Sequence, residues 1–178
     1  MEELFDIYDS NRNYLGRSEE RNTYVFKKGE YHIVTDVFIF NSTNQLLLTR
    51  RAPSKKGGLL WEGTGGSLLP GENSQEAILR EIEEEIGLKV KKEELILYKT
   101  MRRDEEKSPR FKDLWLLKRD FEIDDLVLQE EEVVDAKWTD LDEFIKMLNN
   151  KEIVGTLDFN ENDFKEAIAI LSKSDNHF

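Results

Sequence analysis

The spacing of hydrophobic and polar residues along the chain predicts a mixed α/β domain. The apolar run from His32 to Phe40 predicts a buried strand, and the turn-forming residues 41–44 lead to a returning strand at 45–49. Apolar residues at helical spacing predict a helix over 73–87, with Gly87 at its C-terminal end. Further expected elements are an N-terminal hairpin (4–8 and 14–16), strands at 95–100, 114–117 and 136–139, and helices at 141–148 and 164–171.

Three stretches lack a clear periodicity. Residues 17–29 are polar and leave the choice of element open, and residues 53–58 predict a basic loop. The segment 61–72 contains many residues that break regular structure, so we expect no regular element there. These breakers are Gly63, Gly65, Gly66, Pro70 and Gly71. Near the other end of the chain, His177 is expected to be a solvated tail residue.

Composition and charge narrow the class of protein. The chain has 178 residues, which fits one domain, and its net charge is −12. Such a charge repels a nucleic-acid backbone, so we expect no nucleic-acid partner. No apolar run is long enough to span a membrane, and residues 1–6 do not read as a secretory signal. Without cysteine there is no disulfide and no cysteine nucleophile. We expect a cytoplasmic protein, in which an anionic substrate requires cations or a local basic patch.

Glutamates gather on one face of the helix expected at 73–87. At about 100° per residue, Glu81, Glu84 and Glu85 share an arc of about 100°, whereas Glu83 points elsewhere. Like charges at these spacings destabilise a helix by about 0.2–0.5 kcal/mol per pair. Three convergent carboxylates favour a hard divalent cation, but a solvated acidic face explains the same pattern. The helix alone leaves both interpretations open.

A longer motif surrounds these glutamates. Gly66 is followed by five residues and Glu72, then by seven residues and the segment 80–88, Arg-Glu-Ile-Glu-Glu-Glu-Ile-Gly-Leu. This pattern resembles the Nudix box at all nine of its fixed positions. We estimate that roughly one chain per million of this composition would match by chance. The chain is therefore identified as resembling the Nudix hydrolases.

The resemblance implies a fold and a division of the chain. We expect an α/β fold, a Nudix-type α/β/α sandwich with a central mixed sheet and an added N-terminal hairpin. A single domain would cover 1–178. Within it, residues 1–29 would form the hairpin and connector, 30–149 the Nudix core, and 150–178 a C-terminal helical extension.

The resemblance also implies a metal site. Glu81, Glu84 and Glu85 would be carboxylate ligands on the helix. Glu72 would bind the metal directly or through water, and a backbone carbonyl at Gly65 would join the shell. The expected ion is Mg²⁺, with Mn²⁺ as an alternative, and the number of ions stays open.

The implied reaction is metal-dependent hydrolysis of a diphosphate bond. The substrate would be a nucleoside diphosphate linked to another group, or a similar small diphosphate. Arg80 lies four residues before Glu84, close enough to pair with its carboxylate. The candidates for the general base are Glu85, Glu130, Glu131 and Glu132. The expected catalytic set consists of Glu132, Arg80 and the three helix glutamates. A homodimer is also possible as a partner arrangement.

A closer resemblance concerns the isopentenyl diphosphate isomerases, which are members of the Nudix superfamily. Residues 46–56, followed by Trp61, are similar to a segment of these enzymes and suggest Arg51 and Lys55 as substrate-binding cations. Trp61 either packs over a substrate or anchors its loop. The isomerases require a cysteine and a histidine-rich metal site, whereas this chain has no cysteine and only His32 could match a ligand. The alternatives are therefore isomerase activity and a non-catalytic nucleotide sensor.

Overall fold

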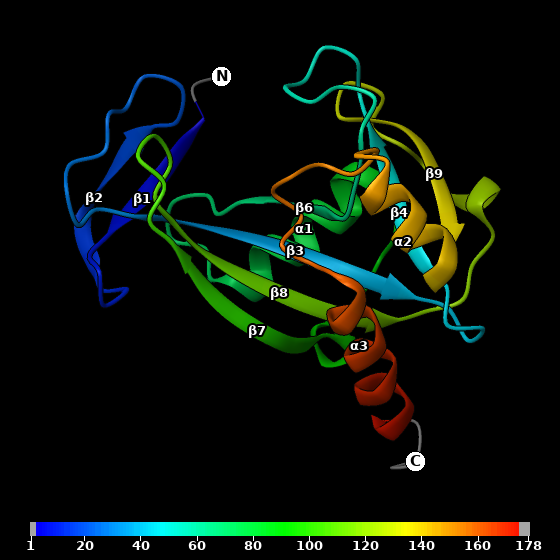
Figure 1. The fold of residues 1–178 in the computed structure, drawn as a ribbon. Helices are drawn as coiled ribbons and strands as arrows, with labels where there is room; N and C mark the ends of the chain where they lie inside the picture. Colours follow the sequence, from blue (N-terminus) through cyan, green and yellow to red (C-terminus); the bar gives the residue numbers. More distant parts are fainter. Residues whose placement is uncertain (1–2, 175–178) are drawn as a thin grey trace.

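The computed structural model describes residues 3–174, so His177 lies outside the described residues. The elements follow the order of the chain in Figure 1. The strands are β1 (Leu4–Tyr8), β2 (Tyr14–Glu20), β3 (His32–Phe40), β4 (Leu46–Arg51), β5 (Trp61–Glu62), β6 (Thr64–Ser67), β7 (Ile96–Arg103), β8 (Arg110–Lys118) and β9 (Val133–Thr139). The α-helices are α1 (Ser74–Ile86), α2 (Leu141–Asn149) and α3 (Glu161–Ser174), with 3₁₀ turns at Lys92–Glu94 and Ile123–Asp125.

A mixed sheet forms the central layer of the molecule. Its main path runs β5-β4-β3-β8-β7, with β6 added to β3 and β9 added to β4. The long strands β3 and β8 are parallel, from the pair His32–Arg110 to the pair Phe40–Lys118, and the other pairs are antiparallel. The separate hairpin β1–β2 lies at the beginning of β3 (Figure 1).

Alternation along the strands builds a hydrophobic core on each face of this sheet. On β3, Phe38 and Phe40 pack with residues of α2 and α3, whereas Val37 and Ile39 pack with α1. Neighbouring side chains of a strand point to opposite faces, so one apolar strand serves both layers. The result is the expected α/β/α sandwich.

The predicted helix at 73–87 is confirmed as α1, with capping at both ends. Asn73 accepts hydrogen bonds from the backbone N–H groups of Gln75 and Glu76, both at 3.0 Å, and the carboxylate of Glu76 accepts one from the N–H of Asn73. Gly87 closes the helix with φ 70°, a conformation that glycine adopts without strain. Its apolar face is buried as predicted, at Ile78, Ile82 and Ile86.

The expectation of an irregular segment at 61–72 is wrong for its first half. Residues 61–62 and 64–67 are strands, and Gly65 and Gly66 pair with Asp36 and Thr35 of β3. A side chain at Gly65 would place its Cβ 2.2 Å from the carbonyl oxygen of Thr35. Glycine here permits close strand packing and does not break the strand. The second strand of the hairpin also extends beyond its expected end, to Glu20.

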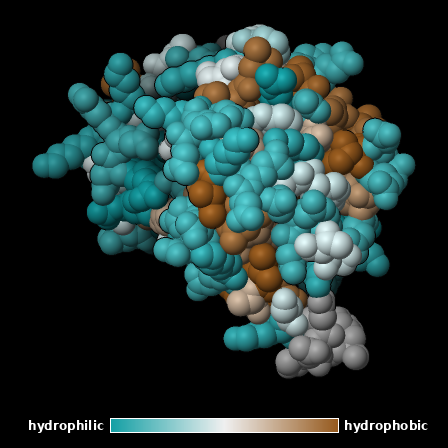
Figure 2. Space-filling view, turned by 45° about the vertical axis from the view of Figure 1, so that its right-hand side comes forward, coloured by the Kyte–Doolittle hydropathy of each residue, from teal (hydrophilic) through white to brown (hydrophobic). Residues whose placement is uncertain are grey.

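The surface is largely polar. Hydrophilic side chains cover most of the face seen in Figure 2, and hydrophobic ones form narrow bands between them. Among residues 3–174, no helix is long and apolar enough to cross a membrane.

Candidate active site

One arginine holds three of the predicted carboxylates together. Arg80 binds Glu72 through two nitrogens, at 2.8 and 3.0 Å, and donates to Glu81 and Glu84 at 2.9 Å each. It also donates to the carbonyl oxygen of Ser67 at 3.1 Å. The predicted pairing of Arg80 with Glu84 is confirmed. A single positive charge thus connects the loop before α1 with the acidic face of the helix.

Glu85 is the most buried of the three helix glutamates, with 9% of its surface exposed. Its carboxylate accepts a hydrogen bond of 3.3 Å from the backbone N–H of Gly65. Burial raises its pKa well above the usual value, and the negative charges of Glu81 and Glu62 raise it further. Burial also raises the pKa of Glu81, against the opposing charge of Arg80. Both groups would gain from a nearby cation.

The donors at this site suit a hard divalent cation. Carboxylate oxygens are the ligands that Mg²⁺ prefers. Gly66 leaves room beside the helix, because a Cβ there would lie 2.2 Å from a carboxylate oxygen of Glu81. Within residues 3–174, no three acidic or histidine side chains already converge as a metal centre, and Arg80 binds three of the predicted ligands. A cation would compete with Arg80 for Glu72, whose two oxygens both bind the arginine, whereas Glu81 and Glu84 each bind Arg80 through one oxygen only.

The basic loop contacts carboxylates beside the helix. Arg51 forms an ion pair with Glu62 at 2.5 Å, and Lys55 forms one with Glu132. Glu62 and Glu132 both add to the negative charge that raises the pKa of Glu85. Glu130 and Glu131 are exposed in the turn before β9. Glu62 was not among the predicted site residues, although its position directly after Trp61 could have indicated it.

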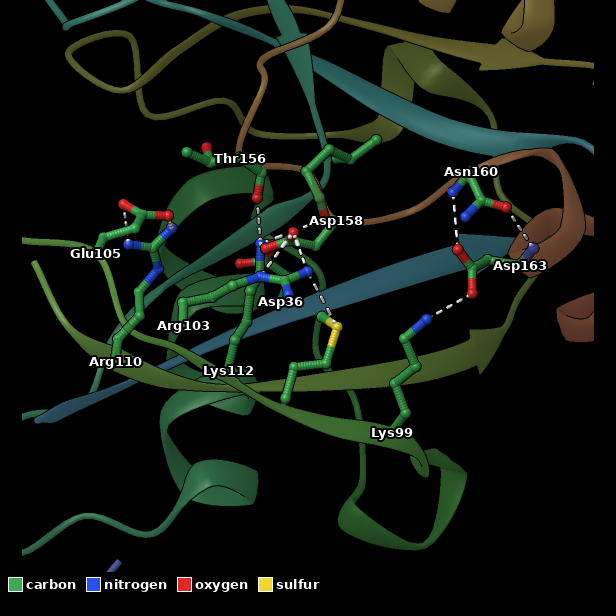
Figure 3. Close-up of polar contacts among 12 residues, drawn as sticks. Asp36, Lys99, Arg103, Glu105, Arg110, Lys112, Thr156, Asp158, Asn160 and Asp163 are labelled. Carbon is green, nitrogen blue, oxygen red and sulfur yellow. Dashed lines mark hydrogen bonds and ion pairs between the residues drawn. The ribbon is translucent and has the colours of Figure 1, made fainter. Parts of the chain in front are cut away.

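A second charged cluster was missed by the sequence analysis (Figure 3). Lys112 of β8, whose side chain is only 4% exposed, pairs with Asp36 of β3 at 2.6 Å. It also donates to the carbonyl oxygens of Thr156 and Leu157, at 2.5 and 3.3 Å, and lies 3.6 Å from Asp158. Lys112 thereby ties the segment between α2 and α3 to the centre of the sheet. The pattern of residues around Lys112 predicts only a strand and does not indicate this role.

A cleft of about 480 Å³ adjoins the acidic helix. Gly65 and Gly66 line one part of it, next to Glu81 and Glu85. Arg51 also lines the cleft, whereas Lys55 is not among its lining residues. The cleft therefore lies next to the carboxylates of the helix, although none of these carboxylates lines it among the described residues.

Trp61 and His32 differ in their position relative to the cleft. Trp61 of β5 packs against the core cluster that includes Phe144 of α2, and the cations of Arg50 and Lys137 lie 5.8 and 4.8 Å from its ring centroid. It anchors its loop and does not line the cleft. His32 does line the cleft, is 6% exposed, and lies 3.1 Å from the hydroxyl of Ser108 through Nε2. Burial lowers its pKa to about 3, so it is neutral at pH 7.

The chain resembles known proteins over most of its length. A NUDIX domain model matches residues 30–157. An uncharacterized Nudix hydrolase of Listeria monocytogenes is 33% identical over 156 residues, covering 86% of this chain and 89% of the relative. An isopentenyl-diphosphate Delta-isomerase of Pectobacterium atrosepticum is 41% identical, but over 85 residues that cover 47% of this chain and 46% of the isomerase.

Solved structures show the same fold. DR0079 from Deinococcus radiodurans superimposes with a TM-score of 0.67 at 19% identity, covering 85% of this chain and 92% of that chain. A Caenorhabditis elegans Ap4A hydrolase gives a TM-score of 0.58 at 21% identity, covering 80% and 98%. Together with the intact box on α1, the family match shows that the chain belongs to the Nudix family and is a hydrolase. Nudix hydrolases act on small diphosphate compounds and generally need divalent cations.

Proposed function

We propose that this protein hydrolyses a diphosphate bond in a small nucleotide-like compound, with Mg²⁺ as its cofactor and Mn²⁺ as a substitute. The observation that carries the proposal is the pair Glu81 and Glu85. Both are carboxylates withdrawn from water beside a cleft, and the pKa of each is raised by burial. Groups in this state bind a divalent cation because it relieves their unfavourable charge.

The residues of the chain divide the chemical work. Glu81, Glu84, Glu85 and Glu72 would hold the cation, with the carbonyl group of Gly65. When bound, the cation neutralises charge on the diphosphate and activates a water molecule for attack at phosphorus. Arg80 orients the carboxylates through the hydrogen bonds it already makes to Glu72, Glu81 and Glu84.

A carboxylate must accept the proton of the attacking water. Glu132 and Glu85 are the candidates for this role, and they lie close enough for the charge of Glu132 to act on Glu85. Lys55 stays paired with Glu132 and holds its carboxylate in place. Arg51 lines the cleft and can turn from Glu62 to the phosphate oxygens of a substrate.

The test compares two glutamates of the same helix. Glu85→Gln should lower the rate of diphosphate cleavage by at least about 100-fold and weaken Mg²⁺ binding measured by calorimetry. Glu83→Gln is the matched control, because Glu83 is exposed and lies 3.6 Å from Lys89 as its ion-pair partner. Its activity and Mg²⁺ affinity should equal those of the wild type. Equal rates for the two folded variants would reject the proposed site.

The isomerase alternative is tested with the same preparations. Isopentenyl diphosphate should give no dimethylallyl diphosphate, because the chain contains no cysteine and only one histidine in the cleft. The sensor alternative predicts tight nucleotide binding without product. Formation of the isomerised product, or binding without any hydrolysis across a panel of diphosphates, would replace the proposed activity.

The structure sharpens the expectation for the two basic residues. Arg51 lines the cleft and Lys55 does not, although both pair with carboxylates next to Glu85. Arg51→Ala should therefore raise the Michaelis constant more than Lys55→Ala does. Lys55→Ala should act mainly on turnover, since it removes the partner of Glu132. Unchanged kinetics in both variants would show that the loop serves only packing.

A further inference from the structure

The N-terminal segment supplies one wall of the cleft. The cleft extends from Gly66, beside the acidic helix, to Phe5, Tyr24 and Phe26. These three aromatic residues precede the region that matches the NUDIX domain model, which begins at residue 30. The part of the chain outside the family match therefore contributes directly to the space where the substrate binds.

The aromatic wall is formed by rings packed on one another. Phe5 and Phe26 are stacked with their centroids 5.6 Å apart and their planes at 9°. Tyr24 meets both rings edge-on, at 6.2 and 5.2 Å, and His32 lies 5.1 and 5.4 Å from Phe5 and Phe26. Phe5 is buried, whereas Tyr24 and Phe26 are half-buried and are the rings more accessible to a ligand.

Polar contacts hold this wall in place without a ligand. Glu30 accepts hydrogen bonds from Arg17 at 2.6 Å and from the hydroxyl of Tyr24 at 2.5 Å. The backbone groups of Tyr8 and Tyr31 bond to each other at 2.8 and 2.9 Å and join the hairpin to β3. The wall is thus preorganised, which lowers the entropic cost of binding.

The charges around the cleft favour an anionic ligand. Each of its three lining carboxylates pairs with a lining cation: Asp36 with Lys112, Glu62 with Arg51 and Glu105 with Arg110. Among the described residues that line the cleft, this leaves an excess of positive charge from Arg21, Lys56 and Lys107. A chain of net charge −12 therefore contains a cleft with a positive excess.

Arg21 lines the same cleft as Tyr24 and Phe26 of the aromatic wall and Gly66 beside the acidic helix. Arg21 forms an ion pair with Glu3 at 2.9 Å, which is exposed and therefore weak. Arg21 is available to a phosphate that lies between the aromatic wall and the helix.

The chemistry of the lining selects among diphosphates. An isoprenoid chain would require a continuous apolar lining, whereas the aromatic wall here is flanked by Asn22 and Ser108, which can donate and accept hydrogen bonds. Flat rings beside amide and hydroxyl groups suit a planar heterocycle. A volume of about 480 Å³ lies within the range of about 300–1,000 Å³ that is typical of small-molecule sites.

We propose that the N-terminal segment determines substrate specificity, by binding the heterocyclic base of a nucleotide against Phe26 and Tyr24 while the phosphates extend past Arg21 towards Gly66 and Glu81. This assignment rests on the proposed diphosphate hydrolysis for its biological meaning. The binding itself requires no turnover and can be tested separately.

The experiment measures binding in EDTA, where no hydrolysis is expected. The probes are AMP, GMP, CMP and UMP, with isopentenyl diphosphate as the non-aromatic comparison, each titrated into the full chain by calorimetry. Phe26→Ala should weaken binding of the preferred nucleotide by about tenfold or more, because base stacking on an aromatic side chain contributes on this scale. Isopentenyl diphosphate should bind more weakly than that nucleotide and be insensitive to the substitution.

Two further variants make the result unambiguous. Val25→Ala is the matched control, since Val25 lies between the two aromatic residues in sequence, is 81% exposed and does not line the cleft. It should bind nucleotides as the wild type does. Phe26→Leu keeps an apolar side chain and removes the ring, so it answers the question if Phe26→Ala fails to fold, and it should also weaken binding.

The outcomes distinguish this assignment from the proposed hydrolysis. Nucleotide affinity within twofold of the wild type in a folded Phe26→Leu protein would overturn the role of the aromatic wall, even if diphosphates are hydrolysed. Tighter binding of isopentenyl diphosphate than of any nucleotide would overturn it as well. Nucleotide binding that depends on Phe26 supports the assignment, even if the Glu85→Gln experiment rejects catalysis.

Discussion

Two charged clusters are built in opposite ways: that of Lys112 lines the cleft, whereas that of Arg80 lies behind the lining residues Gly66 and Ser67. At Arg80, one guanidinium group serves Glu72, Glu81 and Glu84, so carboxylates are in excess. At Lys112, one ammonium group is enclosed by Asp36, Asp158 and two backbone carbonyls, and Asp158 also pairs with Arg103, so the charges balance. The side chain of Arg80 is 22% exposed, whereas that of Lys112 is 4% exposed.

This difference distinguishes a cluster that can bind a further cation from a cluster that only connects parts of the fold. Water and ions can reach the exposed part of the Arg80 cluster, and its excess of negative charge favours binding of a second cation. The Lys112 cluster is withdrawn from water and its cation already has several oxygen partners, so breaking it leaves charges buried without compensation. Burial and the ratio of cations to carboxylates thus distinguish a cluster suited to binding a cation from a cluster that stabilises the fold.

The largest effect on stability is expected at the buried cluster. Lys112→Met should lower the free energy of unfolding by about 3–5 kcal/mol, because Asp36 loses its ion pair and the carbonyl groups of Thr156 and Leu157 lose their donor. Urea denaturation measures this change. The double variant Lys112→Met/Asp36→Asn should lose less than the sum of the single variants. A loss below about 1 kcal/mol for Lys112→Met would remove the contrast between the clusters.

Magnesium should act on the exposed cluster alone. At a concentration 100 times its dissociation constant, a ligand of the folded state stabilises it by about 2.7 kcal/mol. We expect this gain for the wild type and for Glu83→Gln, and a much smaller gain for Glu85→Gln. Thermal unfolding in EDTA and in Mg²⁺ provides the comparison. Equal stabilisation of all three proteins would place the cation elsewhere.

Removal of Arg80 should cost less than removal of Lys112. Arg80→Met deprives Glu72, Glu81 and Glu84 of their shared donor, but the side chain of Glu84 is 52% exposed, so water can solvate part of the cluster in its place. We expect a loss of about 1–2 kcal/mol in EDTA, measured by urea denaturation. A loss as large as that of Lys112→Met would mean that the acidic cluster is equally structural.

The smallest effect is a gain in stability at Glu85. Its pKa in the folded protein is raised above the ordinary value of 4.5, so the carboxyl group favours folding below that pH and loses this contribution as the pH rises. Glu85→Gln in EDTA should therefore be more stable than the wild type at pH 7, by on the order of 1 kcal/mol. The difference should vanish below about pH 4.5. A stability difference that does not change with pH would separate this gain from the charge of Glu85.

Much of the fold followed from local patterns. The apolar run at His32–Phe40 became β3 with the expected bounds, and Asn73 and Gly87 ended α1 where capping rules place them. The glycines of β6 led to the wrong prediction of an irregular segment. Gly65 breaks an isolated strand, but close pairing with Thr35 requires it, and only the neighbouring strand reveals that requirement.

The sequence by itself determined the acidic face of α1, the family and the class of reaction, because these depend on residues with fixed spacing on one helix and its preceding loop. The tertiary structure alone decided which charges meet. Asp36 and Lys112 are 76 positions apart in the chain and become partners because β3 and β8 are parallel neighbours. The hairpin at the N-terminus joins the cleft for the same reason: contacts between distant segments depend on topology, which no local pattern of residues encodes.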